Sequence, residues 1–226
     1  MVRTVDLDAA ILSKIDRDRQ EHTRVIGRYY PSVIGNCKRK TYYTYILDDR
    51  TNDDLKRIFS VGEALHDFVA RALKEDPKIK HCESEVPISI YIPECDFTIS
   101  GRIDNIVTDE NGEERIIEVK STGQKVEFLK EPKPENVEQL NIYLVARQIQ
   151  HGDVFYVEKN TLKTAQFPVE RDRELFLSKT IKDYAVLDEC LREGKLPAPE
   201  GKIYKEMAWQ CQRCEYKKEC EEDING

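Results

Sequence analysis

The sequence has no long apolar run, no internal repeat and no low-complexity tract. No stretch approaches the roughly 18–20 apolar residues that a membrane span needs. The N-terminal stretch carries early acidic residues in place of the apolar segment of a secretory signal. We therefore expect a cytoplasmic protein without a membrane partner.

The chain also has fewer basic than acidic residues: 36 Lys and Arg and 43 Asp and Glu, which give a formal net charge of −7. A nucleic-acid-binding protein is more often basic. Carboxylates that hold a divalent metal would explain part of the deficit, and attraction of a polyanion depends on local patches. The densest patch is Lys38, Arg39 and Lys40, directly after Cys37, and we expect it to contact any nucleic acid that the protein binds.

The cysteines do not suggest a disulfide framework, because there are seven of them and the expected compartment is reducing. Three crowd together near the C-terminus as Cys211, Cys214 and Cys220, a spacing typical of metal ligands. Cys82, Cys95 and Cys190 are interpreted as small apolar core residues.

Length and periodicity predict one α/β domain with a small appendage, in which helices flank a mixed sheet. The strongest helix covers residues 53–75, whose apolar positions share one stripe, and Asp76-Pro77 should end it. The later elements are expected in this order: strands at 85–91, 97–107 and 115–120, a helix at 135–150, strands at 153–158 and 162–169, and a helix at 171–193 that Gly194 should end.

The second and third strands carry a candidate site. Glu118 and Lys120 lie two positions apart on a strand, so they share one face. A three-residue loop at 110–112 would place Asp104 opposite Glu118, whereas a two-residue loop would turn Asp104 to the other face. The longer loop needs a left-handed residue at its third position, which is Gly112. The turn therefore permits the register that clusters the three side chains.

These residue types suit hydrolysis at a metal. Two carboxylates can hold a hard cation such as Mg²⁺, which keeps several waters, and a lysine can offset developing negative charge. Each piece has an ordinary reading: a Glu-x-Lys pair is common on exposed strands, and His66 on its apolar helical stripe is more often a core residue. Gln139 and Tyr143, four apart on one helix face, could equally cover the sheet.

Taken in order, the motifs resemble one family. Gly62-x3-His66, Gly101-x2-Asp104, Glu118-x-Lys120 and Gln139-x3-Tyr143 follow the pattern of the RecB-like branch of the PD-(D/E)xK nuclease superfamily. The three C-terminal cysteines, with Cys37 far upstream, are similar to the AddB-type four-cysteine cluster, and the length resembles the CRISPR-associated single-domain iron–sulfur exonucleases. The resemblance covers about residues 37–220. Ile103 stands where the superfamily name has Pro, at a position whose side chain does no chemistry.

The resemblance implies a role for each motif residue. The implied metal ligands are His66, Asp104, Glu118 and the Val119 carbonyl, with Lys120 as the catalytic lysine and Gln139 and Tyr143 as substrate-positioning residues. The implied cofactors are Mg²⁺ or Mn²⁺ and a [4Fe–4S] cluster on Cys37, Cys211, Cys214 and Cys220. The implied substrate is DNA, preferably single-stranded and cut from an end, in CRISPR spacer acquisition or DNA repair alongside integration or repair proteins.

Several alternatives stay open at this point. Four thiolates also suit zinc, and the nuclease fold could instead serve as a non-catalytic docking subunit or a zinc-stapled DNA-binding protein. We expect three segments: a helical one at 1–50 that contributes Cys37, a nuclease core at 51–195, and a cysteine segment at 196–226 that packs against the first. Trp209 is interpreted as a shield for the metal centre.

Overall fold

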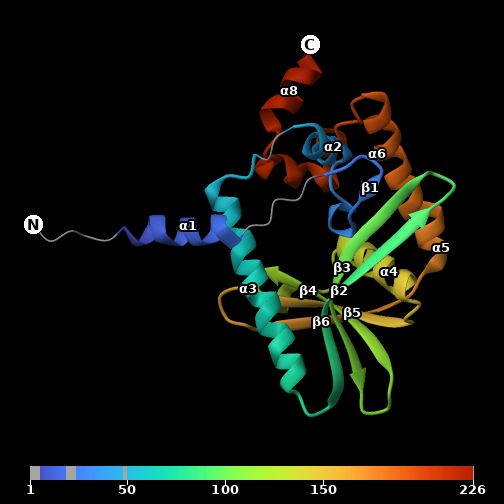
Figure 1. Ribbon diagram of the computed structural model, residues 1–226. Coiled ribbons are helices and arrows are strands. Elements are labelled where there is room, and N and C mark those ends of the chain that lie inside the picture. Colours follow the sequence, from blue (N-terminus) through green and yellow to red (C-terminus); the bar gives the residue numbers. More distant parts are fainter. Residues whose placement is uncertain (1–5, 19–23, 48–49, 226) are drawn as a thin grey trace, which may run out of the picture.

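A six-stranded mixed sheet organises the protein (Figure 1). The computed structural model describes residues 6–18, 24–47 and 50–225, so parts of the expected N-terminal segment (1–5, 19–23 and 48–49) and residue 226 lie outside the described residues. The strand order is β1-β3-β4-β5-β6, with β2 paired to β3. The strands are β1 (Arg28–Tyr29), β2 (Ile79–Ile92), β3 (Phe97–Asp109), β4 (Glu114–Thr122), β5 (His151–Glu158) and β6 (Thr164–Glu170).

Helices cover both faces of this sheet. The longer ones are α1 (Leu7–Asp18), α2 (Lys38–Ile46), α3 (Asp53–Glu75), α4 (Pro134–Arg147), α6 (Ile181–Glu193) and α8 (Lys217–Asn225). The short ones are α5 (Arg173–Leu175) and α7 (Glu200–Ile203), and the η4 segment Lys205–Arg213 is a 3-10 helix. None of the helices formed by the described residues is long and apolar enough to cross a membrane.

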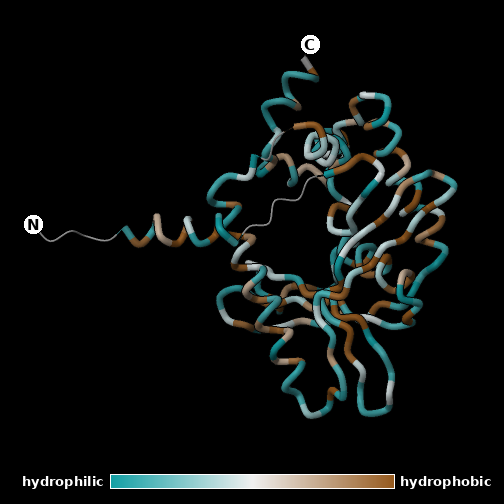
Figure 2. The backbone as a smooth tube through the Cα atoms, viewed as in Figure 1, coloured by the Kyte–Doolittle hydropathy of each residue, from teal (hydrophilic) through white to brown (hydrophobic). Residues whose placement is uncertain are grey.

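Two hydrophobic clusters hold the layers together. On one face, Leu65 and Val69 of α3 pack with Ile117 and Val119 of β4. The larger cluster includes Leu140, Ile142 and Leu144 of α4 together with Ile116 and Val154 of the sheet. Figure 2 shows the same division, since brown segments gather along the central strands and teal predominates on the outer turns. The alternation along β4 therefore sends Val119 toward α3 and its neighbours Glu118 and Lys120 the other way.

Helix α3 has the bounds that the sequence predicted. The side chain of Asn52 caps its start by accepting a hydrogen bond from the Leu55 backbone N–H at 2.9 Å, which satisfies one of the free donors of the first turn. The last predicted helix is less regular, because a π-helical stretch at Phe176–Thr180 precedes α6. Thr180 in this stretch donates a hydrogen bond to the buried Glu138 of α4 at 2.9 Å.

The β3–β4 turn is the three-residue loop that the sequence predicted. Gly112 has a φ of +86°, and the backbone N–H of Asp109 donates to the Glu113 carbonyl at 3.1 Å. The strands then pair with Asn105 opposite Ile117. Asp104 and Glu118 are the next residues beyond that pair, so the predicted register is confirmed.

The N-terminal and C-terminal parts of the chain meet beside the sheet, where α2 lies next to the η4 segment and α8 (Figure 1). The Cys37 backbone N–H donates to Gln210 Oε1 at 2.8 Å, and the Tyr43 hydroxyl donates to Asp223 Oδ2 at 2.5 Å. These bonds join residues that are far apart in the sequence. They place Cys37 beside the segment that carries the other three clustered cysteines.

Candidate active site and cysteine pocket

The candidate catalytic residues lie where the pairing of β3 is interrupted on both sides. The ladder with β4 stops at Asn105 and Ile117, one position before Asp104. On the other side, the pairing with β2 skips Glu85, which has a φ of +56°. A left-handed conformation is uncommon for a residue other than glycine and costs energy inside a strand. The interruption leaves the Asp104 backbone outside the regular ladder.

The Asp104 carboxylate contacts two groups. Its Oδ2 atom accepts a hydrogen bond from the Val119 backbone N–H at 2.8 Å, and its Oδ1 atom lies 3.4 Å from Nδ1 of His66 on α3. Burial disfavours the protonated imidazole, but the hydrogen bond and negative charge of Asp104 outweigh it, so the pKa of His66 is raised. The structure thus brings His66, Asp104 and Val119 together at one point.

Glu118 is the most deeply buried of these acids, with a side chain only 1% exposed. Its Oε1 atom lies 2.8 Å from Lys120 Nζ, whereas its Oε2 atom is buried and has no hydrogen-bond partner among the described residues. Burial, followed by the nearby charge of Asp104, raises the pKa of Glu118 to about 7. A buried carboxylate oxygen without a partner is costly, which is expected where a cation normally supplies the missing interaction.

Helix α4 completes the site from its side of the sheet. The Lys120 ammonium donates to Gln139 Oε1 at 2.8 Å, and the Gln139 amide lies 3.4 Å from the Tyr143 hydroxyl, to which it donates. Burial alone would lower the pKa of Lys120, but the charge and hydrogen bond of Glu118 raise it. Lys120 is therefore held as a cation between β4 and α4.

Gly101 has a steric role in this arrangement. A Cβ atom at Gly101 would lie 2.9 Å from Pro31 Cδ and 3.3 Å from Cε1 of Tyr143. The absence of a side chain lets Tyr143 pack directly against β3. By contrast, a Cβ atom at Gly62 would meet only Ser121 Oγ, at 3.5 Å, which is ordinary contact. The Gly101 position is sterically demanding, and the Gly62 position is not.

The donor set fits a hard divalent cation. Mg²⁺ is commonly held by one or two carboxylates and keeps several waters, and here the Asp104 carboxylate is near enough for its charge to raise the pKa of the buried Glu118. Among the described residues, no group of three or more His, Cys, Asp or Glu side chains is arranged to enclose an ion. His66, Asp104 and Glu118 do not yet enclose a cation together, so their role as ligands, like that of the Val119 carbonyl, stays a prediction.

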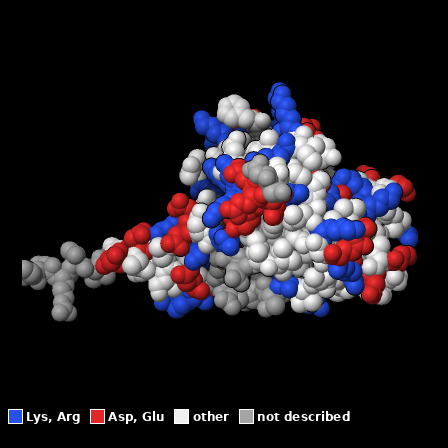
Figure 3. Space-filling model, turned by 90° about the horizontal axis from the view of Figure 1, so that it is seen from above, with Lys and Arg blue, Asp and Glu red and all other residues white. Residues whose placement is uncertain are grey.

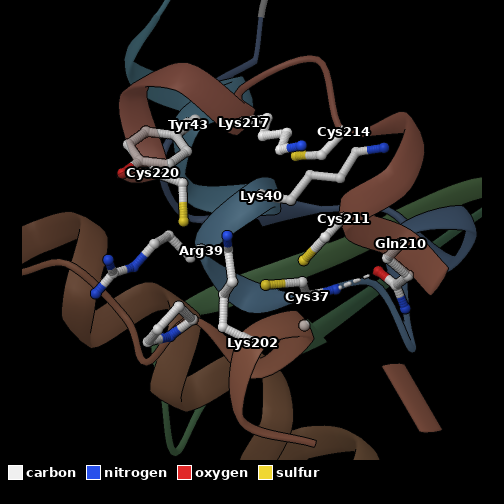
Figure 4. Close-up of a pocket in the computed structure, with 12 residues that line it drawn as sticks. Cys37, Arg39, Lys40, Tyr43, Lys202, Gln210, Cys211, Cys214, Lys217 and Cys220 are labelled. Carbon is white, nitrogen blue, oxygen red and sulfur yellow. Dashed lines mark hydrogen bonds between the residues drawn. The ribbon is translucent and has the colours of Figure 1, made fainter. Parts of the chain in front are cut away.

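Four cysteines lie around a second site, at the start of α2 (Figure 4). Cys37, Cys211, Cys214 and Cys220 line one pocket, and no disulfide links any of the described cysteines. Figure 4 shows the sulfurs of Cys37 and Cys211 turned toward each other. The pocket has a volume of only about 20 Å³, which is room for about one water molecule. Cys82, Cys95 and Cys190 do not line it.

Cationic side chains line this pocket, and two of them, Lys40 and Lys202, pair with Glu215 and Glu221 outside the lining. Arg39, Lys40, Lys202 and Lys217 line it, and no carboxylate does so among the described residues. Gly201 supports the same geometry, because a Cβ atom there would lie 2.7 Å from Cys211 Sγ. Among the described residues, however, the thiols do not lie in a ready-made metal-binding arrangement, so a thiolate–metal centre at this pocket stays a prediction. As found, the pocket would have to widen to take a four-iron cluster.

The three basic residues after Cys37 do not form a freely exposed basic patch, and their contact with DNA stays a prediction. Lys38 Nζ lies 2.9 Å from Asp183 and 2.8 Å from Glu200, and Lys40 Nζ lies 2.8 Å from Glu215. Arg39 is buried and donates to the Pro197 carbonyl at 2.7 Å. Figure 3 shows basic and acidic side chains intermingled on the face that carries this end of the molecule. The three cations bind the C-terminal parts of the chain.

Three further residues lie in settings that the sequence did not predict. Trp209 does not line the cysteine pocket and is 55% exposed, so it does not shield the thiols. Tyr156 is the β5 partner of Lys120, and its hydroxyl accepts hydrogen bonds from α4. Glu85 lies opposite Asp104 in the interrupted ladder. The alternation of side chains along the predicted strand at 153–158 could have indicated that Tyr156 faces the site. No feature of the sequence indicates the position of Glu85.

Comparison with known proteins gives both a family and a fold. The profile of the PD-(D/E)XK nuclease superfamily matches residues 79–221. The crystal structure of SSO0001 is similar with a TM-score of 0.68 and 19% identity, over 93% of this chain and 94% of that chain. The crystal structure of an alkaline exonuclease (LHK-Exo) from Laribacter hongkongensis has a TM-score of 0.48 and 16% identity, over 74% of this chain and 90% of that chain. The structure of LHK-Exo in complex with dAMP has a TM-score of 0.46 and 14% identity, over 75% of this chain and 90% of that chain. A sequence search of curated proteins gave no match.

Proposed function

This chain belongs to the PD-(D/E)XK nuclease superfamily, and from this premise we propose that it is a deoxyribonuclease that depends on Mg²⁺ or Mn²⁺. The observation that carries the proposal is the unpartnered Oε2 of Glu118, buried beside Asp104. A solvated hairpin with an ordinary Glu–Lys pair would expose that oxygen to water. Its burial indicates a position built for a cation.

The proposed ligands are His66, Asp104, Glu118 and the Val119 carbonyl. When bound, the divalent cation would lower the pKa of a water molecule and offset charge on the phosphate. Asp104 is already oriented by the Val119 N–H, and Glu118 is oriented by Lys120. The protein therefore holds both carboxylates in place without the cation.

Lys120 is the proposed catalytic lysine. In hydrolysis, a water oxygen forms a bond to phosphorus, the bond from phosphorus to the leaving sugar oxygen breaks, and that oxygen takes a proton. Lys120 can place its positive charge where the phosphate becomes more negative. Gln139 and Tyr143 act as positioning residues, because Gln139 accepts a hydrogen bond from Lys120 and donates one to Tyr143.

We propose further that the enzyme acts as an exonuclease on single-stranded DNA ends. The pathway that we propose is CRISPR spacer acquisition or DNA repair, with integration or repair proteins as partners. These finer assignments rest on the family resemblance of the motifs. A docking subunit with a nuclease fold is the competing function, and the complete set of Asp104, Glu118 and Lys120 favours catalysis over it.

The direct test is digestion of matched linear and circular single-stranded DNA, the linear form labelled at one end, with Mg²⁺, Mn²⁺ or a chelator. An exonuclease should degrade the linear DNA, spare the circle and stop in chelator. Duplex DNA of the same sequence tests the strand preference. Cleavage in chelator would contradict metal dependence, cleavage of the circle would contradict the exonuclease assignment, and no cleavage of any substrate would favour the docking subunit.

For the cysteine pocket we propose a [4Fe–4S] cluster held by Cys37, Cys211, Cys214 and Cys220, with zinc as the alternative. The four free thiols and the surrounding cations support a thiolate–metal centre, and the choice of iron–sulfur rests on the family resemblance. We also propose the corresponding division of the chain: an N-terminal segment at 1–50, a nuclease core at 51–195 and a cysteine segment at 196–226. Iron, zinc and acid-labile sulfide analysis of anaerobically purified protein separates the two centres.

A further inference from the structure

Trp209 is the single tryptophan of the chain, and its setting does not suit a packing residue. It lies in the η4 segment of the cysteine-bearing end, with 55% of its side chain exposed. The ammonium of Lys133, from the start of α4, lies 5.2 Å from the centre of its ring. A cation over an indole is a favourable contact, so the ring is held in place while much of its surface stays open.

The pair lies at a cavity between the nuclease core and the cysteine-bearing end. The cavity has a volume of about 670 Å³, and Lys133, Trp209, Met207 and Gln210 are among the residues that line it. Of the lysines that line the cavity, Lys38 and Lys179 pair with Asp183, and Lys179 also contacts Glu138. The lining residues include more carboxylates than cations. A phosphate chain would be repelled from the interior, whereas a neutral flat group at the Trp209 rim would not be.

The rim is also connected to the candidate active site. The Lys133 backbone N–H donates to the Tyr156 hydroxyl at 3.0 Å, and the Asn136 side chain donates to the same oxygen at 2.7 Å. Tyr156 is the direct strand partner of Lys120. The rim with Trp209 is therefore separated from the catalytic lysine by one buried tyrosine and the start of α4.

We infer that Trp209 and Lys133 form a binding site for single-stranded DNA, in which a base stacks on the indole and an adjoining phosphate contacts the ammonium. The inference rests on the proposed function, because it assigns where that enzyme holds its substrate. Every base has a flat face, so stacking of this kind accepts any sequence. Bases in a duplex already stack on each other, so the site favours single strands.

The test uses the fluorescence of this one tryptophan. Oligothymidylate is titrated into the protein in chelator, so that binding is measured without cleavage, and a blunt duplex is titrated in parallel. Stacking should quench the fluorescence saturably with the single strand and much less with the duplex. An unchanged signal during binding of the single strand, or equal quenching by the duplex, would overturn the inference.

Substitutions separate the stacking from the charge. Anisotropy of labelled oligothymidylate should show about tenfold weaker binding for Trp209→Ala, within the range for loss of one stacked base, and near-normal binding for Trp209→Phe. Lys133→Met should make the plot of log affinity against log salt concentration less steep by about 0.7, the contribution of one phosphate of a single strand. Trp209→Ala should leave the slope of that plot unchanged. Tyr204→Ala is the matched control, because Tyr204 is 48% exposed and does not line the cavity.

The outcomes also separate this inference from the proposed function. If the protein degrades single-stranded DNA while Trp209→Ala binds it like the wild type, the inference fails alone. If oligothymidylate quenches the tryptophan but no DNA is cut with Mg²⁺ or Mn²⁺, the proposed function fails and the binding site stands. Equal melting temperatures of wild type and variants show that the fold is kept. If Trp209→Ala unfolds, the difference between single strand and duplex in quenching the wild-type Trp209 fluorescence carries the test.

Discussion

The candidate active site and the cysteine pocket are built in opposite ways. The active site takes Asp104, Glu118 and Lys120 from two neighbouring strands, and hydrogen bonds already fix Asp104 Oδ2 and Lys120 Nζ. The cysteine pocket takes Cys37 from one end of the chain and its other three thiols from the opposite end. Its geometry depends on contacts across the chain, such as Lys40 with Glu215 and Cys37 with Gln210.

This difference predicts what each site contributes. Strand register and α4 preorganise the first site, so substitutions there should remove activity and leave the fold. The second site joins the two ends of the fold, so substitutions there should first destabilise it.

Cys37→Ser should have the largest effect, and it should be on stability. Linking chain segments this far apart restricts the unfolded chain by about 4–5 kcal/mol in the loop-entropy estimate, and metal binding adds to folding when the site forms only in the folded chain. We expect loss of bound metal and a large drop in melting temperature, measured by metal analysis and thermal unfolding. Cys190→Ser is the control, because Cys190 lies outside the pocket. A melting temperature of Cys37→Ser equal to that of the wild type would contradict a structural role for the metal centre.

Lys120→Gln should lower the cleavage rate by on the order of a hundredfold or more, in the range for removing one group that stabilises a transition state. The glutamine can still donate to Glu118 and Gln139, so the melting temperature should change little. Metal affinity should be retained, since Lys120 is not a ligand. Lys163→Gln is the control, because Lys163 pairs with Glu127 away from the site. Wild-type cleavage by Lys120→Gln would exclude Lys120 as the catalytic lysine.

His66→Ala should act through the metal. A proposed ligand 3.4 Å from Asp104 should, when removed, raise the Mn²⁺ concentration for half-maximal cleavage by about tenfold, as changes in the surroundings of a metal do. The measurement is a metal titration of the cleavage rate, with thermal unfolding in parallel. Early melting together with an unchanged metal requirement would mean that His66 only fills space.

Lys40→Met should have the smallest effect. Its ammonium is paired with Glu215, and a pair of this kind contributes roughly 0–1 kcal/mol to stability. Because that charge is already neutralised, affinity for oligothymidylate and its salt dependence should stay close to wild type, in contrast to Lys133→Met. A loss of DNA affinity as large as that of Lys133→Met would restore the basic patch after Cys37 as part of the DNA path.

Local rules made much of the fold predictable from the sequence. The bounds of α3 follow from one apolar stripe and from the stop at Asp76-Pro77. The β3–β4 register follows from the left-handed backbone conformation that the turn requires at Gly112. The mixed α/β fold and the superfamily resemblance are confirmed. These features depend on residues close together in the chain, where turn chemistry and periodicity act directly.

The remaining features depend on distant contacts. Lys38 and Lys40 are not free cations, because they pair with carboxylates far along the chain: Asp183, Glu200 and Glu215. The two-residue strand β1 exists only through parallel pairing with Thr98 and Ile99. Trp209 was assigned to the cysteines by its place in the sequence, whereas its ring faces Lys133. Sequence spacing carries no information on these partners.

Proposed metal binding depends most on Glu118, whose buried Oε2 atom has no hydrogen-bond partner among the described residues. The most direct measurement is calorimetric titration of Mn²⁺ into wild type and Glu118→Gln, with cleavage of end-labelled single-stranded DNA followed in the same preparations. Wild type should bind Mn²⁺ and cut the DNA, whereas Glu118→Gln should keep its melting temperature in the absence of metal but lose both binding and cleavage. Cleavage at the wild-type rate by Glu118→Gln, or by wild type in chelator, would contradict the account.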